Sequence, residues 1–502
     1  MGYITTPIYY ASGEPHLGHA YTTLLADARR RYLQLRHGNC RLLTGTDEHG
    51  QKISRTAERQ GITVEEFVAE KSAVFKNLWQ NLEIDCDFVR TTDASHVEFV
   101  RSCWNKLLAN DDLYVGDYTG SYCVECEQFL RGVEECPVHK IPLEIISESG
   151  YFFRLSKYQN QLIAHLENHE QFITPRSRYE EALSFLTNQP LQDLSVSRRS
   201  TSWGIPVPGD ADQVIYVWLD ALLSYLSALG LSGSSLTELE SEEQSLVVVF
   251  QQAEHFIGKD ILIFHAVYWP AILLALNLPL PKALRVNGWL TVEGQKIAKS
   301  NPATIKNPAK LAEQYSLDGL RTYLLSCTVS GQDVDFSEDK LRDSVNHTLA
   351  NTIGNLVGRC AALFAKNYPE GISKPESQPE FAAELWLLRE KVIADYEESF
   401  EQGDPARACR VCFDFASRLN GYFQNSAPWH QTESEQSVSL WWFHGFLQDL
   451  TLLLAPFTPE LSGKARQVLR LGLLESCEQC FQPKIDQLRS AARSSPLVVK
   501  IG

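Results

Sequence analysis

YITTPIYYASGEPHLGHA, the stretch at residues 3–20, decides the fold because it joins a strand signal to a helix signal. Residues 3–10 are β-branched and aromatic, as a buried strand should be. A glycine-containing turn follows, and residues 21–35 have helical spacing. CRLLTGTDEHG, residues 40–50, predicts a second strand that runs into a polar loop. Strand, helix and strand in this order predict the start of a parallel, nucleotide-binding α/β sheet.

The rest of the chain predicts a divided sheet domain and a helical end. Strand-like VIYVWLDALL and HFIGKDILIFH, residues 214–223 and 255–265, return to the sheet pattern, whereas the polar residues 231–245 predict an exposed loop. Apolar spacing of 3.6 residues dominates from residue 351 and predicts a helical bundle. We therefore divide the chain into five parts: the two halves of the sheet domain at 1–112 and 213–290, an insertion at 113–212, a linking region at 291–350 and the bundle at 351–502.

Composition limits the class of protein. A chain of 502 residues is too long for one ordinary core and predicts several folded units. The net charge of −16 argues against a general nucleic-acid binder, although a few well-placed Lys and Arg residues suffice for phosphate contacts. The first residues have no basic, then apolar, leader pattern, and no apolar run has the length of a membrane span. We expect a cytoplasmic protein whose twelve cysteines are reduced or bind metal.

His16-Leu17-Gly18-His19 comes directly after the first strand and opens the first helix. Histidines three residues apart share a helix face, and the N–H groups and dipole at a helix N-terminus attract phosphate. Gly18 allows a base or ribose to approach the backbone closely. Taken alone, the motif also fits a pair of surface histidines at a helix start.

A second basic motif, Lys296-Ile297-Ala298-Lys299-Ser300, follows the strand-like LRVNGWLTVEG. Two lysines on one loop can neutralise the charge that develops on leaving pyrophosphate, although a solvated basic turn would read the same. Together, the two motifs resemble the two signatures of class I aminoacyl-tRNA synthetases. That family usually has Met-Ser between the lysines, where this chain has Ile297 and Ala298. Both lysines and Ser300 are retained, so we expect the departure to affect loop dynamics and leave the chemistry intact.

Two cysteine-containing pairs predict a metal site. Cys123 and Cys126 form one pair and Cys136 and His139 the other, with nine residues between the pairs. Four sulfur and nitrogen ligands complete a closed tetrahedral Zn²⁺ site, which predicts one structural zinc per chain. Two further Cys-x-x-Cys pairs occur: the pair at 409 and 412 fits helix packing, and the pair at 477 and 480 lies near the C-terminus.

Seven blocks in order resemble the methionyl-tRNA synthetase family, and they cover nearly the whole chain. They are TTPIYYASGEPHLGHAYTT, LLTGTDEHGQKI, YCVECEQFL with CPVHK, WGIPVP, YVWLDALLSY, HFIGKDILIFHAVYWPA and GNLVGR. The resemblance implies a Rossmann-like parallel-sheet catalytic domain with a single zinc-knuckle insertion (the connective peptide), a stem-contact region at 291–350 and a C-terminal all-α anticodon-binding bundle.

The resemblance also assigns residues to each substrate. The methionine pocket would consist of Ile8, Tyr10, Asp47, Trp218, Ala221, Leu222, Tyr225, Ile261 and His265. Asp47 would hold the α-ammonium group, while the aromatic and aliphatic side chains suit a thioether. Leu222 stands where some family members have proline, so the pocket could differ slightly in shape. For Trp218, Tyr225, Ile261 and His265 taken singly, ordinary core packing is the alternative.

The remaining assignments concern ATP, the chemistry and tRNA. Gly258, Lys259 and Asp260 resemble an ATP-binding turn, which Gly18, Lys299 and Ser300 would complete. His16, His19, Lys296 and Lys299 would stabilise the transition state of adenylate formation from methionine and ATP with Mg²⁺. Asn355, Arg359 and Trp429 would read the anticodon of tRNA(Met), since aromatic and arginine planes suit unstacked bases.

Two other classes of protein stay open at this point. A relative that makes an adenylate without charging tRNA should lack the helical domain, and an RNA-binding derivative without enzyme activity should have lost its signature His or Lys residues. This chain has the helical region and both signatures. We expect no membrane partner and, since no OB-like strand region follows the bundle, a monomer.

Overall fold

The computed structural model describes residues 1–123, 128–130, 133–136, 141–199, 203–232, 241–297, 305–327, 331–471 and 487–488. The chain divides into two compact units. Unit 1 comprises residues 1–15 and 41–287, and unit 2 comprises residues 16–40 and 288–502. The helix after the first strand therefore belongs with the C-terminal part of the chain, although it follows the first strand of unit 1 in sequence.

A six-stranded sheet forms the centre of unit 1, in the order β3-β2-β1-β12-β13-β7. Its strands are β1 (Gly2–Tyr10), β2 (Cys40–Asp47), β3 (Asp87–Arg90), β7 (Ile173–Thr174), β12 (Ala253–Gly258) and β13 (Ala283–Asn287). The pairs β1/β12, β2/β3, β12/β13 and β13/β7 are parallel, as the sequence predicted. Strand β7 comes from the stretch that the sequence placed in the insertion.

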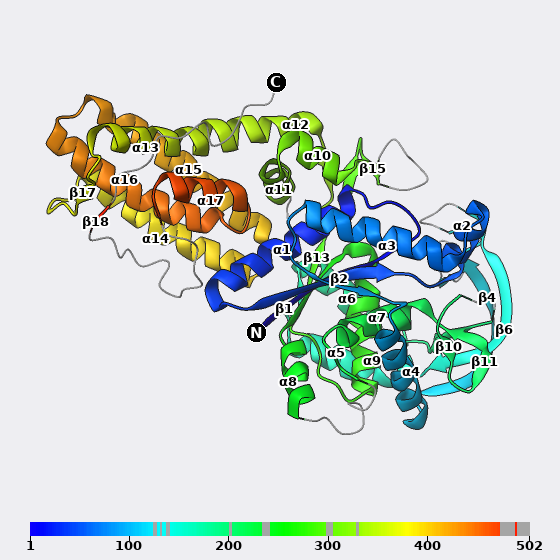
Figure 1. Ribbon diagram of the computed structural model, residues 1–502. Helices are drawn as coiled ribbons and strands as arrows, with labels where there is room; N and C mark the ends of the chain where they lie inside the picture. The colour runs from blue at the N-terminus through cyan, green and yellow to red at the C-terminus, as the bar shows by residue number, and fades with distance from the viewer. Residues whose placement is uncertain are drawn as a thin grey trace. The chain divides into compact units, whose positions relative to one another are not determined.

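Helices pack around this sheet (Figure 1). They are α2 (Gln51–Gln60), α3 (Val64–Asn81), α4 (Ala94–Ala109), α7 (Val217–Ser227), α8 (Ser241–Phe250) and α9 (Trp269–Ala275). The sheet expectation for residues 214–223 was wrong beyond β11 (Asp210–Ile215), because residues from Val217 onward are helical. Buried residues on every side of α7 gave an apolar run that a strand and a buried helix share. Likewise, residues 241–245 lie in α8 and not in a loop.

The insertion is a second β layer in unit 1. Strands β5 (Gln128–Leu130), β4 (Leu113–Cys123), β6 (Glu144–Phe153) and β8 (Leu194–Ser195) form an antiparallel sheet in that order. Helices α5 (Gln159–Asn168) and α6 (Arg176–Thr187) follow β6. A small sheet of β10 (Pro206–Val207), β11 and β9 (Ser197–Arg198) leads the chain back to α7.

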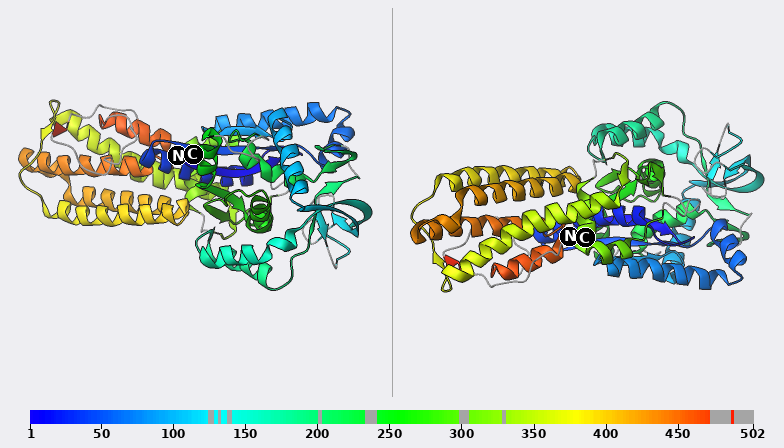
Figure 2. Two further views of the ribbon diagram at one scale, coloured as in Figure 1. Left: turned by 90° about the horizontal axis from the view of Figure 1, so that it is seen from below. Right: turned by 90° about the horizontal axis from the view of Figure 1, so that it is seen from above.

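Unit 2 is mostly helical. It begins with α1 (Leu17–His37) and contains a three-stranded sheet of β15 (Gln295–Lys296), β14 (Leu290–Val292) and β16 (Val334–Phe336). Shorter helices follow: α10 (Pro308–Tyr315), α11 (Leu317–Ser326), α12 (Glu338–Asp343) and the π-helical η6 (Ser344–Gly354). The predicted bundle is present as α13 (Asn355–Asn367), α14 (Glu380–Glu401), α15 (Pro405–Ser426), α16 (Glu433–Leu454) and α17 (Pro459–Val468). Figure 2 shows α14 and α15 side by side in both views.

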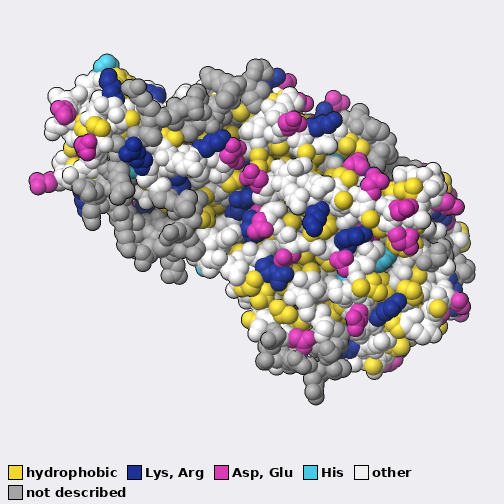
Figure 3. All heavy atoms as spheres, in the orientation of Figure 1, with side chains coloured by type: hydrophobic (Ala, Val, Ile, Leu, Met, Phe, Trp, Pro, Cys, Tyr) yellow, Lys and Arg dark blue, Asp and Glu magenta, His cyan; other side chains and the backbone are white. Residues whose placement is uncertain are grey.

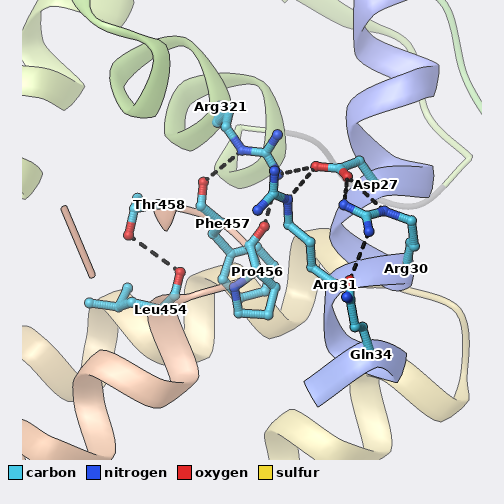
Figure 4. A network of polar contacts seen from close by, with 9 residues as sticks. All are labelled: Asp27, Arg30, Arg31, Gln34, Arg321, Leu454, Pro456, Phe457 and Thr458. Carbon is cyan, nitrogen blue, oxygen red and sulfur yellow. Dashed lines mark hydrogen bonds and ion pairs between the residues drawn. The ribbon is translucent and has the colours of Figure 1, made fainter. Parts of the chain in front are cut away.

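A buried ion cluster joins three parts of unit 2 (Figure 4). Asp27 of α1 accepts from Arg30, at 2.9 Å, from Arg31, at 2.7 Å, and from Arg321 of α11, at 2.7 Å. Arg321 also donates to the carbonyl oxygens of Pro456 and Phe457, which lie between α16 and α17. Asp27 and Arg321 are fully buried, so helix α1, helix α11 and the bundle share one desolvated charge pair.

Two further findings concern the surface and the cysteines. Basic and acidic side chains are interspersed on the face drawn in Figure 3. Within the described residues, no helix is both long and apolar enough to cross a bilayer.

Cys409 and Cys412 are fully buried on α15, which supports packing as their role, while residues 477 and 480 lie outside the described residues.

Candidate functional site

The His16–His19 motif forms the start of α1 by a local exchange of hydrogen bonds. The backbone N–H of Gly18 donates to Nδ1 of His16 at 3.1 Å, and the backbone N–H of His16 donates to Nδ1 of His19 at 3.0 Å. The two rings stack with centroids 3.8 Å apart. Because each Nδ1 is an acceptor, the ring proton of either neutral imidazole lies on Nε2, from which it can be donated to a phosphate oxygen.

This exchange explains where the helix begins. The motif opens the helix at Leu17, as expected and ahead of the helical spacing seen from residue 21, because the histidine side chains satisfy its first N–H groups. A Cβ on Gly18 would lie 3.0 Å from the His16 ring, so a larger residue here would have to displace that ring. The close approach of a base or ribose to Gly18 stays a prediction.

Lys296, the first residue of the second basic motif, is the last residue of β15. Strands β14 and β15 are joined by Glu293 and Gly294, both with positive φ, as a two-residue hairpin turn requires. The Lys296 Nζ lies 4.0 Å from the centre of the Trp289 ring. Helix α1 contacts β14, which pairs with β15, and the described residues of both signature motifs belong to unit 2. Lys299 and Ser300 lie outside the described residues.

The residues expected to bind methionine come from five elements of unit 1, which are β1, β2, α7, η3 (Lys259–Ile261) and η4 (Phe264–Tyr268). Trp218, Ala221, Leu222 and Tyr225 share one face of α7, since they lie at spacings of three, four and seven residues. Ile8 of β1, Ile261 after β12 and these α7 side chains belong to one apolar cluster. Trp218 stacks on Phe264, with ring centroids 3.7 Å apart. Tyr10 is half-buried at the end of β1, where it packs on a neighbouring small cluster.

Tyr225 and His265 form a hydrogen-bonded pair within this apolar region. The Nδ1 atom of His265 lies 3.0 Å from the Ile261 carbonyl oxygen, and its Nε2 lies 2.8 Å from the Tyr225 hydroxyl. A carbonyl only accepts, so Nδ1 carries the proton and Nε2 accepts from Tyr225. Burial lowers the pKa of His265 to about 4, so the imidazole is neutral at pH 7. Burial likewise raises the pKa of Tyr225, which stays a hydroxyl.

Asp47 is the last residue of β2, at the carboxyl edge of the sheet. Its carbonyl oxygen accepts from the Ala11 N–H at 2.9 Å, which joins the ends of β1 and β2. Glu48 is fully buried, and its carboxylate accepts from Arg90 at 2.8 and 2.9 Å. Ligands of parallel α/β sheets bind outside this edge, so the position suits an ammonium-binding carboxylate.

Gly258 is the last residue of β12, and Lys259 and Asp260 follow it at the same edge of the sheet. Lys259 is half-buried and Asp260 is exposed. A Cβ on Gly258 would lie 2.7 Å from Oδ1 of Asp260, so a larger residue at this position would require the Asp260 side chain to move. Gly258 thus ends a strand that pairs with β1, whose last residue is the methionine candidate Tyr10.

The predicted zinc knuckle lies partly within the described residues. Cys123 ends β4 and Cys136 lies beyond β5, and both are fully buried. The Cys136 N–H donates to the Ile141 carbonyl oxygen at 2.8 Å. Cys126 and His139 lie outside the described residues. Two buried sulfur atoms at the positions that the spacing predicted fit a soft metal such as Zn²⁺.

The expected anticodon readers meet at one end of the bundle. Arg359 of α13 lies with its guanidinium carbon 4.5 Å from the centre of the Trp429 ring. Trp429 is 37% exposed and follows α15 in the short 3₁₀ helix η7 (Pro428–His430). Asn355 is exposed one turn before Arg359 on the same helix. These three residues, distant in sequence, therefore form one partly exposed polar and aromatic surface.

The sequence reasoning missed Phe264, Glu48 and Asp220. Phe264 was one more aromatic residue in an apolar segment, and its stacking on Trp218 depends on the tertiary fold. Glu48 and Asp220 carried a stronger signal, since both are carboxylates in runs of residues that the structure buries. A buried carboxylate needs partners, and the sequence did not reveal which residues those are.

Comparison with known proteins agrees with the geometry of both units. The family model described as tRNA synthetases class I (M) matches residues 2–143 and 135–361. The methionine–tRNA ligase of Caldanaerobacter subterraneus is 37% identical, over 98% of this chain and 77% of that protein. The methionine–tRNA ligase of Streptomyces coelicolor is 38% identical, over 92% of this chain and 88% of its own length.

The chain belongs to the methionine–tRNA ligase family. It is thus an aminoacyl-tRNA ligase with the class I, Rossmann-like fold. Among solved structures, Mycobacterium tuberculosis methionyl-tRNA synthetase in complex with methionyl-adenylate superposes with a TM-score of 0.93 and 32% identity. That match covers 99% of each chain, so the insertion and the bundle also have counterparts in a methionine–tRNA ligase.

Proposed function

We propose that this ligase activates methionine with ATP and transfers the methionyl group to tRNA(Met), for both initiation and elongation of protein synthesis. The observation that carries the choice of amino acid is the apolar region around Trp218, which contains the hydrogen-bonded pair of Tyr225 and His265. A thioether suits such a pocket, since sulfur packs well against aromatic ring edges. Asp47 at the adjoining strand end pairs with the α-ammonium group.

In the first step, the methionine carboxylate attacks the α-phosphorus of ATP and the bond to the bridging oxygen breaks. Pyrophosphate leaves, with Mg²⁺ accompanying the nucleotide. The Nε2–H groups of His16 and His19 and the ammonium groups of Lys296 and Lys299 stabilise the growing negative charge. Gly18, Ser300 and the turn from Gly258 to Asp260 bind the nucleotide. No side chain acts as a nucleophile, so positioning and charge stabilisation supply the catalysis.

In the second step, a ribose hydroxyl of the terminal adenosine attacks the carbonyl carbon of the adenylate, and AMP leaves. Asn355, Arg359 and Trp429 recognise the anticodon. The exposed part of the Trp429 ring offers a stacking surface, and Arg359 lies against that ring. Bases of an open RNA loop stack on such surfaces. We place this reaction in the cytoplasm and expect a monomer, which light scattering of the purified protein tests.

An ATP–pyrophosphate exchange assay across the twenty amino acids tests the proposal. Exchange should depend on methionine, and subsequent charging should require a tRNA with the CAU anticodon. Exchange with another amino acid would overturn the pocket assignment. Methionine-dependent exchange without tRNA charging would instead identify an enzyme that makes the adenylate for another purpose.

Cys123, Cys126, Cys136 and His139 would hold one Zn²⁺ ion, whose four protein ligands leave no open position for catalysis. Such a site contributes folding energy to the insertion. Metal analysis should find one equivalent of zinc per chain, and Cys126→Ser should remove it. A purified, fully active enzyme that contains no zinc would refute the assignment.

A further inference from the structure

Asp220 occupies the centre of a buried hydrogen-bond chain that the proposed chemistry does not use. It lies on α7 between Leu219 and Ala221 and is 1% exposed. Its Oδ2 is 2.7 Å from Nδ1 of His49, and its Oδ1 is 2.7 Å from Nε2 of His96. A carboxylate in so dry a place requires donors, and two imidazoles on different elements supply them.

His49 connects Asp220 to the loop that begins with Asp47. Glu48 separates these two residues, and its own contacts hold the loop on other sides. The Glu48 carboxylate accepts from Arg90, at the end of β3, and its carbonyl oxygen accepts from the Trp203 indole N–H at 2.6 Å. Asp47, the last residue of β2, is therefore followed directly by two residues that are held by hydrogen bonds, one of them through Asp220.

His96 connects the same carboxylate to α4 and to a second turn of α7. Its Nδ1 lies 2.7 Å from the hydroxyl of Ser227, seven residues after Asp220. Seven residues are two helical turns, so one imidazole contacts α7 along about 10 Å of its length. Trp218, Leu222 and Tyr225 thus lie on one face of α7, whereas Asp220 and Ser227, which contact His96, lie on another.

We propose that Asp220 is a positioning residue for amino-acid recognition, which sets the methionine-binding face of α7 in register with the loop that carries Asp47. The assignment rests on the proposed function. The substrate needs its side chain held by α7 and its ammonium group held by Asp47, and a shift of one against the other by about 1 Å can cost about a hundredfold in rate. A carboxylate suits this role because it accepts two hydrogen bonds in fixed directions.

The electrostatics support the geometry. Burial alone would raise the pKa of the Asp220 carboxyl, but His49 and His96 lower it below its usual range. Asp220 is therefore ionised over the working pH range, and it attracts both imidazoles with a full charge. Hydrogen bonds to charged groups are about twice as strong as neutral ones, so this connection is stiff.

The test uses Asp220→Asn, which keeps the shape of the side chain and removes its charge and one acceptor. In methionine-dependent pyrophosphate exchange, the KM for methionine should rise about tenfold or more, while the KM for ATP stays within about twofold. His49→Gln breaks one connection and leaves Asp220 paired with His96, so it should raise the methionine KM by a smaller factor. If Asp220→Asn does not fold, the methionine KM of His49→Gln tests the proposal instead.

Asp112→Asn is the matched control. Asp112 is also a 1% exposed carboxylate of unit 1, and it accepts from Lys157 at 2.6 Å and Tyr158 at 2.7 Å. The Asp112→Asn variant should have lower thermal stability and an unchanged KM for methionine. An unchanged methionine KM in Asp220→Asn, or equal changes in both KM values as in a general loss of fold, would overturn the inference. Wild-type protein without methionine-dependent exchange would instead overturn the proposed function.

Discussion

Two buried carboxylates, Asp27 in unit 2 and Asp220 in unit 1, differ in whether their hydrogen-bond partners can lose a proton. Asp27 is surrounded by guanidinium groups, which keep their charge at any ordinary pH, whereas Asp220 meets two imidazoles, which can lose a proton. Burial would raise the pKa of Asp27, but its three arginines hold it well below its usual range. Asp220 shows the same direction for a different reason, its two histidines.

This difference predicts different roles for the two carboxylates, one in stability and one in the geometry of a site. Removal of the Asp27 charge leaves Arg321 buried as a cation, because a guanidinium cannot be deprotonated in a protein. Removal of the Asp220 charge leaves imidazoles that can become neutral. The arginine cluster should therefore govern stability, and the histidine cluster should govern the geometry of its neighbouring site.

The largest expected effect is on stability. Asp27→Asn should lower the free energy of unfolding by about 3–5 kcal/mol, the cost of a buried charge without its partner. Urea denaturation followed by fluorescence would measure it. Asp220→Asn should lower stability by clearly less. A loss as large for Asp220→Asn as for Asp27→Asn would break the comparison, since both carboxylates would then serve mainly to hold the fold.

Exposed ion pairs provide the baseline for that experiment. Glu170 and Arg176 form a surface pair in which both side chains are more than half exposed. Glu170→Gln should change stability little, because solvent screens the pair. If Asp27→Asn cost no more than Glu170→Gln, the cluster in Figure 4 would contribute no more than a surface contact.

The next effect concerns pH and the proposed methionine pocket. The folded-state pKa of His265 is lowered from 6.5 to about 4, so the unfolded chain takes up a proton first as pH falls. The stabilising effect of the neutral imidazole is present above pH 6.5 and is lost as pH falls from there to about 4, by about 3 kcal/mol in total.

His265→Gln isolates that contribution. A glutamine amide can donate to the Ile261 carbonyl and accept from Tyr225, but it does not titrate. Urea denaturation at several pH values should show a shallower loss of stability below pH 6.5 for the variant than for wild type. Parallel curves would show that His265 is not the group that resists protonation.

The smallest expected effect separates the two reaction steps. If Trp429 stacks on an anticodon base, Trp429→Ala should weaken tRNA charging by about 1–3 kcal/mol, roughly one to two powers of ten. Methionine-dependent exchange should stay nearly unchanged. His19→Ala should suppress exchange itself, since it removes a donor to the phosphates. Equal losses of exchange and charging in Trp429→Ala would mark Trp429 as a packing residue and remove the main support for anticodon recognition by the bundle.

Much of the fold followed from local patterns. Alternating strand and helix signals predicted the parallel sheet, and 3.6-residue spacing predicted the bundle that α13 to α17 form. The motif from His16 to His19 opened the first helix as expected, although helical spacing alone marked it only from residue 21. The strand expectation for residues 214–223 was partly wrong for a physical reason: α7 is buried on all sides, so its apolar residues show no period.

The sequence by itself determined the features that depend on residues close together in the chain. The motif from His16 to His19 caps its own helix within three residues, and the ordered blocks were specific enough to identify the family. The tertiary structure alone decided the partners of groups that the sequence could only mark as important. Asp220 meets His49 and His96 across 171 and 124 residues. Hydrophobic spacing reports that a residue is buried, but hydrogen-bond partners so far apart depend on how strands and helices from distant segments are brought together.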